Sequence, residues 1–382
     1  MPEKLLYEQV YTALKARIRG GGIPVGERLP SPAQLGEEFS VSSITLKRAL
    51  DMLQDEGYVV RRPKHGTVVV DADPQPRGAA AATEGEHEGV RPLRVSGPPL
   101  LGAVITSFDD TFGTRLLSAM LTSTAGRANL VLKTSDGDSA AEGAQIAELL
   151  AAGTLGLAFQ PSSSQSIPPA LMGLLARRFP VVIIDRSFDG VPVSTVCSDN
   201  AGGARKATEH LFALGHRRIG LISSASPVST VEDRRNGYVS AHAAAGVLHH
   251  DQDEFSEVYS VTPGSRVSAA EDLERLVEFV RARPQVTAYL VSEHHIAVLL
   301  MRACRELSLS VPGDVSVVCF DQPFAPLDDS LFRFTHVAQP QALMGARVID
   351  ELFDQLGRPG SVTKHVLPTE LVLGASTAVP RE

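Results

Sequence analysis

Cysteine is scarce in this chain of 382 residues, and the three cysteines lie far apart in the sequence. Cys197, Cys304 and Cys319 form neither a disulfide framework nor a C-x-x-C metal knuckle, so we expect a reducing compartment. The chain also lacks a run of about 18 uncharged apolar residues, and its first residues lack the apolar core of a secretion signal. We therefore expect a cytoplasmic protein that has no membrane partner.

Common enzyme signatures are missing as well. The sequence has no G-x-S-x-G elbow, no G-x-x-x-x-G-K-[ST] phosphate loop and no H-E-x-x-H zinc motif, and the glycines at 20–22 follow a helical pattern. Adjacent histidines at 249–250 and 294–295 point in different directions on a regular element, with no cysteine or carboxylate at ligand spacing. We expect no enzymatic activity, no cofactor and no metal.

Charge is distributed unevenly along the chain. The formal net charge is -8, yet residues 1–70 carry ten Lys or Arg against eight Asp or Glu, which makes that part +2. A segment rich in Pro, Gly, Ala and Glu follows it, without apolar periodicity, as is typical of a linker. The sequence therefore predicts a head at 1–71, a linker at 72–97 and a body at 98–382.

The head has the pattern of a winged helix-turn-helix. Helical periodicity covers 5–19, 32–39 and 43–56, and short strands are expected at 58–62 and 67–70. Leu35, Phe39 and Val41 provide an apolar seat for the third helix, which would then enter the major groove of DNA. The alternative is a generic small bundle with a solvated basic face.

Polar and basic side chains gather at two places in the head, the start of the third helix and the tip of the hairpin. There they can reach base edges, phosphates or the minor groove. The residues expected to contact DNA are Ser31, Ser42, Ser43, Thr45, Lys47, Arg48, Arg62, Lys64, His65 and Gly66. Ser42 is also placed to cap the third helix.

Residues 5–70 closely resemble the winged-helix domain of the gluconate-repressor (GntR) family. The resemblance rests on Leu29-Pro30-Ser31, Val41-Ser42, Ala49-Leu50 and Gly66-Thr67, and it implies sequence-specific DNA binding. Ala33 and Ser43 stand where the family usually has arginines that serve DNA. This departure implies weaker phosphate binding or a different operator.

The body alternates apolar strand-like runs with amphipathic helices. Such runs are typical of parallel sheets buried on both faces, and the length of the body suggests two α/β lobes, each a doubly wound sheet. The runs lie at 100–105, 129–133, 155–159, 181–185, 218–223, 287–292 and 315–320.

The body resembles the effector domain of the lactose/galactose-repressor (LacI/GalR) family, which is similar to periplasmic sugar-binding proteins. The resemblance covers nearly all of 98–375 and rests on the runs 193–200, 215–220, 234–238, 311–317 and 335–340. A GntR-type head on such a body resembles the arabinose-repressor architecture.

An effector site is expected where the body's strands end, because ligands enter open α/β sheets there. A sugar needs carboxylates, amides and an arginine for its hydroxyls, and an aromatic wall for its apolar face. The candidates are Asp109, Asp110, Phe112, Gln160, Asp185, Arg186, Arg234, Glu293, His294 and Asp321. The resemblance favours Arg234 and Asp321, and Glu293-His294 replaces the family's usual Asn-Asp.

Some of these positions also allow purely structural roles. Asp199 and Asn200 can cap a helix, His216 can belong to a turn, and Arg186 can form an ion pair between the lobes.

The functional expectation is a homodimeric repressor that a sugar releases from double-stranded operator DNA. Two alternatives stay open. One is a regulator activated by a corepressor such as a nucleobase or a sugar phosphate. The other is the solute-binding protein of a sugar transporter.

Overall fold

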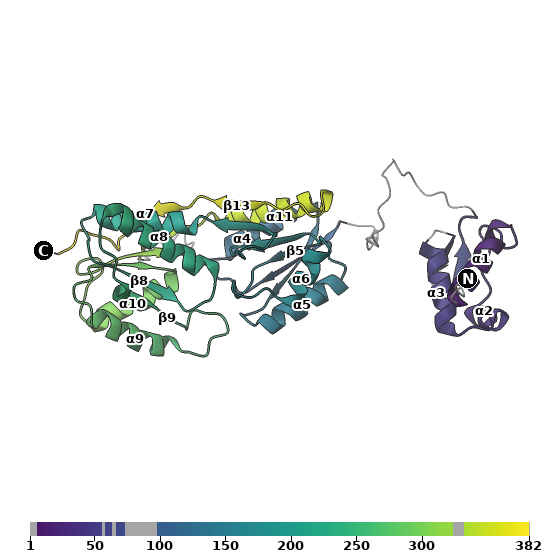
Figure 1. Cartoon of the computed structure of the whole chain (residues 1–382), viewed down its shortest axis with the longest axis horizontal. Coiled ribbons are helices and arrows are strands. Elements are labelled where there is room, and N and C mark those ends of the chain that lie inside the picture. The colour runs from purple at the N-terminus through teal and green to yellow at the C-terminus, as the bar shows by residue number, and fades with distance from the viewer. Residues whose placement is uncertain (1–5, 56–57, 63–65, 73–97, 324–331, 382) are drawn as a thin grey trace. The chain divides into compact units, whose positions relative to one another are not determined.

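The computed structural model describes residues 6–55, 58–62, 66–72, 98–323 and 332–381. The chain divides into two compact units, Met1–Val90 and Arg91–Glu382, which Figure 1 shows in purple and in blue to yellow. Within the described ranges, no helix combines the length and the apolar character needed to cross a bilayer.

The N-terminal unit has the predicted order of three helices and a hairpin. Its elements are α1 (Leu6–Arg19), α2 (Pro32–Phe39), α3 (Ser43–Asp55), β1 (Val59–Arg62) and β2 (Gly66–Val69). Ser31 caps α2 in a capping box with Gln34, whose side chain accepts from the Ser31 amide. Ser42 caps α3 as predicted, since its hydroxyl accepts from the Thr45 amide over 3.3 Å.

A single apolar core holds this unit together. Leu14 and Ile18 of α1 and Leu46 and Leu53 of α3 are almost fully buried, together with Leu35 of α2. Spacings of four residues in α1 and of seven residues in α3 place these side chains on one face of their helix, as the sequence predicted. The packed faces fix α3 against α1 and α2.

The hairpin is extended by a third segment, which the sequence did not predict. Arg62 lies opposite Gly66 across the turn, and a third segment pairs with β2. The amide of Leu29 donates to Thr67, and the amide of Val69 donates to Glu27, each over 2.9 Å. Residues 26–29 lack apolar alternation, so no sequence pattern predicted a strand there.

The first lobe of the second unit contains a parallel sheet in the order β13-β7-β6-β5-β3-β4. Its elements are β3 (Leu100–Ile105), α4 (Thr114–Thr124), β4 (Asn129–Thr134), α5 (Ser139–Ala151), β5 (Gly156–Phe159), α6 (Pro169–Ala176), β6 (Val181–Ile184), β7 (Ser194–Ser198), α11 (Gln341–Gly357) and β13 (Lys364–Leu367).

The second lobe repeats this order as β14-β12-β11-β10-β8-β9, with β14 antiparallel to β12 and the other pairs parallel. Its elements are α7 (Asn200–Ala213), β8 (Ile219–Ser224), α8 (Ser229–Ala245), the 3₁₀ turn η1 (Asp251–Asp253), β9 (Glu254–Val258), α9 (Ala269–Arg281), β10 (Ala288–Val291), α10 (His294–Glu306), β11 (Ser316–Phe320), β12 (Thr335–Ala338) and β14 (Glu370–Val372).

Each sheet is covered on both faces, as the apolar runs predicted. In β3, Leu101 and Ile105 pack in one cluster with Met120 of α4, whereas Val104 packs in another with Ile146 of α5. All seven predicted runs form strands, and the α/β architecture of two lobes is confirmed. Within the described residues, the chain passes between the lobes three times, near Asn200, Gln339 and Pro368.

The interface between α7 and α8 requires a glycine. A Cβ on Gly237 would lie 2.1 Å from the carbonyl oxygen of Ala201 and 2.9 Å from the Cβ of Ala204. We expect Gly237→Ala to lower the free energy of unfolding by about 1–3 kcal/mol, because overpacked cores force side chains and backbone to shift. Urea unfolding followed by circular dichroism measures this change.

The matched control is the same substitution at an open helical position. Gly173 on α6 is exposed, and a Cβ there would meet nothing within 4 Å. Gly173→Ala should raise stability by about 0.5–1 kcal/mol, because alanine favours the helix. Equal stability of both variants would contradict the close packing of α7 on α8.

Candidate functional site

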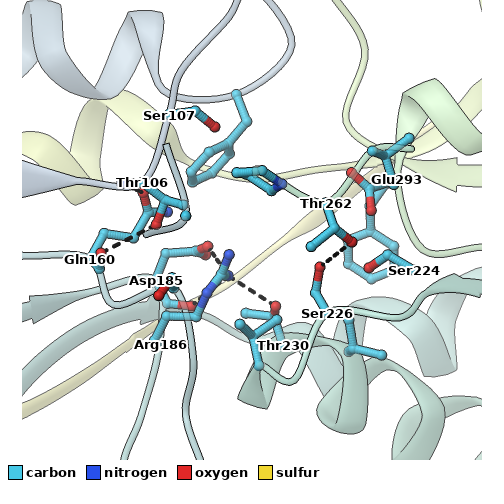
Figure 2. Close-up of a pocket in the computed structure, with 18 of the residues that line it drawn as sticks. Thr106, Ser107, Gln160, Asp185, Arg186, Ser224, Ser226, Thr230, Thr262 and Glu293 are labelled. Carbon is cyan, nitrogen blue, oxygen red and sulfur yellow. Dashed lines mark hydrogen bonds and ion pairs between the residues drawn. The ribbon is translucent and has the colours of Figure 1, made fainter. Parts of the chain in front are cut away.

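A cavity of about 430 Å³ lies between the two lobes. In each sheet the strand order reverses at one point, with β3 between β4 and β5 and β8 between β9 and β10. Ligands of open α/β sheets bind outside the carboxyl ends of the strands at such a point. In the first lobe, Thr106 and Gln160 follow β3 and β5, the strands at this reversal. The Thr106 hydroxyl donates to the Gln160 carbonyl over 3.3 Å (Figure 2).

Nine of the ten predicted effector residues line this cavity, and Asp110 does not. A tight turn explains the difference. The Asp109 carboxylate accepts from the amides of Thr111 and Phe112 over 2.6 and 3.0 Å. This turn brings Phe112 to the cavity wall and leaves Asp110 exposed, so Asp110 is corrected to a surface residue.

Two aspartates occupy equivalent places in the two lobes. Asp185 follows β6 and Asp321 follows β11, and these strands hold the same position in the order of their sheets. Both aspartates have a φ of 59°. Aspartate tolerates this left-handed conformation better than most residues, but it still stores strain, and such strain concentrates at functional sites. Both side chains are buried, with exposures of 3% and 5%.

Arg234 of α8 lies at the centre of the polar wall. Its Nε donates to the Asn200 side-chain oxygen over 2.8 Å and its Nη1 to the Ser292 carbonyl over 2.5 Å. The guanidinium also stacks 4.0 Å above the centroid of the Phe320 ring. Asn200 belongs to a crossing between the lobes, so Arg234 ties the cavity to that crossing.

Burial changes the charge states in the cavity. It raises the pKa of Asp321 to about 6, although the neighbouring Arg234 guanidinium and a hydrogen bond from Gln339 act in the opposite direction. It lowers the pKa of His294 to about 4, so that this imidazole is neutral near pH 7. Burial also raises the pKa of Glu293, again against the attraction of Arg234.

Hydrogen bonds join the two lobes beside the cavity, and we call this set the interlobe clasp. The Ser229 amide donates to the Ser164 hydroxyl over 3.0 Å, and the Ser187 amide donates to the Ser229 hydroxyl over 2.9 Å. Arg186 donates to the Thr230 hydroxyl over 3.0 Å while it pairs with the neighbouring Asp185 carboxylate (Figure 2). Arg186 therefore connects the lobes by a hydrogen bond, and its ion pair stays within one lobe.

Two other positions have structural roles. Asp199 caps α7 by accepting from the Gly202 amide over 2.8 Å. His216 is buried, and its ring nitrogens contact the Thr287 hydroxyl and the Ala378 carbonyl, each over 2.9 Å. Asp199 is therefore a helix cap, as expected. His216 directly follows the turn after α7 and joins two other segments of the lobe.

The predicted DNA-contacting residues lie at the start of α2, where Ser31 is the cap, in the first half of α3 and in the hairpin. Lys47 is exposed, while Arg48 stacks 4.2 Å above the centroid of the Tyr7 ring. The hydroxyl of Thr45 lies 2.9 Å from that of Ser42. Ser43 begins α3, Arg62 ends β1 and Gly66 begins β2; Lys64 and His65 lie outside the described residues.

The histidine pair at 249–250 lies close to carboxylates, which the sequence analysis did not expect. His249 lies near two carboxylates, those of Asp251 and Glu254, and one atom from each of the three residues falls within 4.8 Å of the others. The premise that no carboxylate lies near this pair is therefore wrong. Arg235 already binds Glu254 through two nitrogens at 2.6 and 3.0 Å, and its positive charge opposes a metal ion there.

Comparisons with known proteins agree with both parts of this architecture. Residues 6–69 match the family described as bacterial regulatory proteins, gntR family, and residues 208–377 match a periplasmic binding protein-like domain. These matches give the chain a GntR-type head and a periplasmic binding protein-like domain behind it. It is similar to the arabinose metabolism transcriptional repressor of Geobacillus stearothermophilus, with 26% identity over 365 residues and 93% of each chain covered.

Solved structures show the same fold. The transcription regulator CcpA of Lactococcus lactis aligns with a TM-score of 0.64 and 21% identity, over 74% of this chain and all of that one. The lac repressor dimer bound to operator and an anti-inducer aligns with a TM-score of 0.61 and 22% identity, over 74% of this chain and 95% of that one. These proteins are regulators rather than enzymes, as the missing enzyme motifs indicated.

Proposed function

We propose that the protein is a homodimeric transcriptional repressor, acting in the cytoplasm, whose operator affinity falls when a small polyhydroxylated effector binds between its lobes. The observation that carries this proposal is a polar cavity between two lobes, on the same chain as a winged-helix head. Repression is also what the name of the Geobacillus relative states, and the lac repressor structure supports a dimer on its operator.

The coupling follows from how the cavity is built. Its walls come from both lobes, and the interlobe clasp holds them together. An effector that contacts both walls favours the closed form, and a ligand shifts an equilibrium only by its different affinity for the two forms. Closure then changes the spacing of the two heads, each of which places the N-terminal end of α3 in a major groove.

The experiment starts from DNA duplexes selected by the full-length protein from a randomised pool. Fluorescence anisotropy then measures affinity for the selected duplex with and without a panel of sugars, sugar phosphates and nucleobases. We expect at least one sugar to weaken binding by about 5–150-fold, the usual range of allosteric coupling. If no duplex is enriched, the protein is not a sequence-specific repressor; if nucleobases strengthen binding, the effector is a corepressor.

Lys47→Ala tests the placement of α3. Lys47 is exposed on this helix, and we expect it to neutralise one phosphate. Its loss should weaken operator binding and reduce the slope of log affinity against log salt by about one unit. Anisotropy titrations at several salt concentrations measure the slope.

The matched control for Lys47 is Lys133→Ala. Lys133 lies on β4 in the effector domain, where it pairs with Glu148. This variant removes the same charge and should leave both affinity and slope at wild-type values. A slope that is unchanged in Lys47→Ala would remove Lys47 from the DNA interface.

A further inference from the structure

The cavity is rich in carboxylates. Its described lining contains four carboxylates, those of Asp109, Asp185, Glu293 and Asp321, and only two guanidiniums. Asp109 lies near the rim, about half exposed, 3.7 Å from the imidazole of His295. The deeper part therefore has one more carboxylate than guanidinium.

The two guanidiniums are already engaged with these carboxylates and with backbone. Arg186 pairs with Asp185, and Arg234 is attracted to Asp321, Asp185 and Glu293 while it donates to Ser292. An anionic ligand that drew either cation toward itself would weaken the attraction of that cation to these buried carboxylates. A phosphate or carboxylate on the effector would add a further negative charge, and burying an unpaired charge is costly.

Buried acceptor atoms remain open in the same place. Asp185 Oδ1, Asp321 Oδ1 and the side-chain oxygen of Gln339 have no hydrogen-bond partner among the described residues. Arg186 Nε and His294 Nδ1 lack a partner as well, and the hydroxyls of a sugar ring can satisfy both because they donate and accept. Each of the three acceptor residues is at most 5% exposed, and all three line the cavity. Unsatisfied buried acceptors destabilise a protein, so the group that completes them must be a hydrogen-bond donor.

From this charge excess and these open acceptors, we propose that the effector is an amino sugar whose ammonium group is bound by the Asp185 and Asp321 carboxylates. This proposal rests on the proposed function of the cleft. An ammonium group brings three hydrogen-bond donors and one positive charge, which balances the excess carboxylate in the deeper part of the cavity. A neutral hydroxyl group brings one donor and no charge.

The rest of the lining suits a sugar ring. Eleven serine and threonine residues line the cavity, and their hydroxyls can both donate and accept, as ring hydroxyls do. Phe108 and Phe112 offer apolar surface beside them. Figure 2 shows Ser224, Ser226 and Thr262 on one side of the cavity and Asp185 and Arg186 on the other.

The test compares sugars that share one ring and carry a neutral, a positively charged or a negatively charged substituent. Calorimetry at pH 7 measures the binding of D-glucose, D-glucosamine, N-acetyl-D-glucosamine and D-glucose 6-phosphate to the full-length protein, and of the same four forms of galactose. We expect at least one amino sugar to bind at least tenfold more tightly than its neutral parent and its N-acetyl form. The phosphates should not bind.

A variant shows whether charge causes the preference. Glu293→Gln keeps the shape of the side chain but removes the excess negative charge, so it should reduce the advantage of the amino sugar at least tenfold. Glu232→Gln is the matched control, because Glu232 is exposed on α8 and does not line the cavity. It should keep the wild-type preference.

Three outcomes overturn the proposal: a neutral sugar or a phosphate that binds as tightly as its amino counterpart, no binding by any amino sugar, or an unchanged preference in Glu293→Gln. The operator experiment separates this failure from that of the proposed function. A neutral sugar that binds and releases operator DNA would leave the repressor assignment intact.

Discussion

Replacing Arg234 with methionine should abolish the response to effector and lower the free energy of unfolding of the effector domain by about 3–5 kcal/mol, the usual cost of removing one partner from a buried ionic group. Methionine keeps most of the volume and leaves Asp185, Glu293 and Asp321 without their shared cation. Asn200 would also lose its donor. Urea unfolding measures stability, and operator binding with and without effector measures the response.

The neighbouring arginine provides the control. Arg235 is about half exposed and pairs with Glu254 at the surface, so Arg235→Met should change stability by at most about 1 kcal/mol. Its effector response should equal that of the wild type. If Arg234→Met unfolds at the wild-type urea concentration, then Arg234 does not compensate the carboxylates of the cavity.

Much of this fold could be predicted because its signals are local. A strand buried on both faces must be apolar throughout, so β3, β6 and β11 stand out in the sequence. Edge strands lack that requirement. β13 and β14 alternate exposed and half-buried side chains, and no apolar run marks them.

The cavity residues at strand ends could be predicted for a similar reason. Parallel strands deliver the residues after their carboxyl ends to one edge of the sheet, which places Gln160 and Asp185 together in the first lobe. Asp321 lies at the corresponding edge of the second sheet, across the cavity. The prediction that Asp110 lines the effector site was wrong, because the turn built on the Asp109 carboxylate decides which neighbouring side chain points inward. Such a turn is set by side-chain hydrogen bonds.

The contacts that sequence reasoning missed lie at or beside the lobe boundary. Asn200 looked like a helix cap, yet it holds Arg234, which lies 34 positions away. Ser164 and Ser229 lie in serine-rich segments that carry no motif, and their contact exists only because two lobes meet. The serine run at 162–164 was the one available signal, and it is equally typical of a solvated loop.

The clasp allows closure to be separated from effector binding. Ser164 and Ser229 belong to different lobes, and the Ser229 amide lies 3.0 Å from the Ser164 hydroxyl. We expect the double variant Ser164→Cys, Ser229→Cys to form a disulfide under oxidation, which would fix the lobes in the closed form. Its operator affinity should then fall at least tenfold and no longer respond to effector, and reduction should restore both properties.

Two single variants, Ser164→Cys and Ser229→Cys, are the controls, and oxidation should leave their operator affinity unchanged. Mass spectrometry under non-reducing conditions shows whether the cross-link has formed. A cross-linked protein that binds operator like the reduced one would mean that closure of the lobes is not the signal sent to the head. Because the disulfide fixes the lobes without any effector, this test of closure does not depend on which sugar the cavity binds.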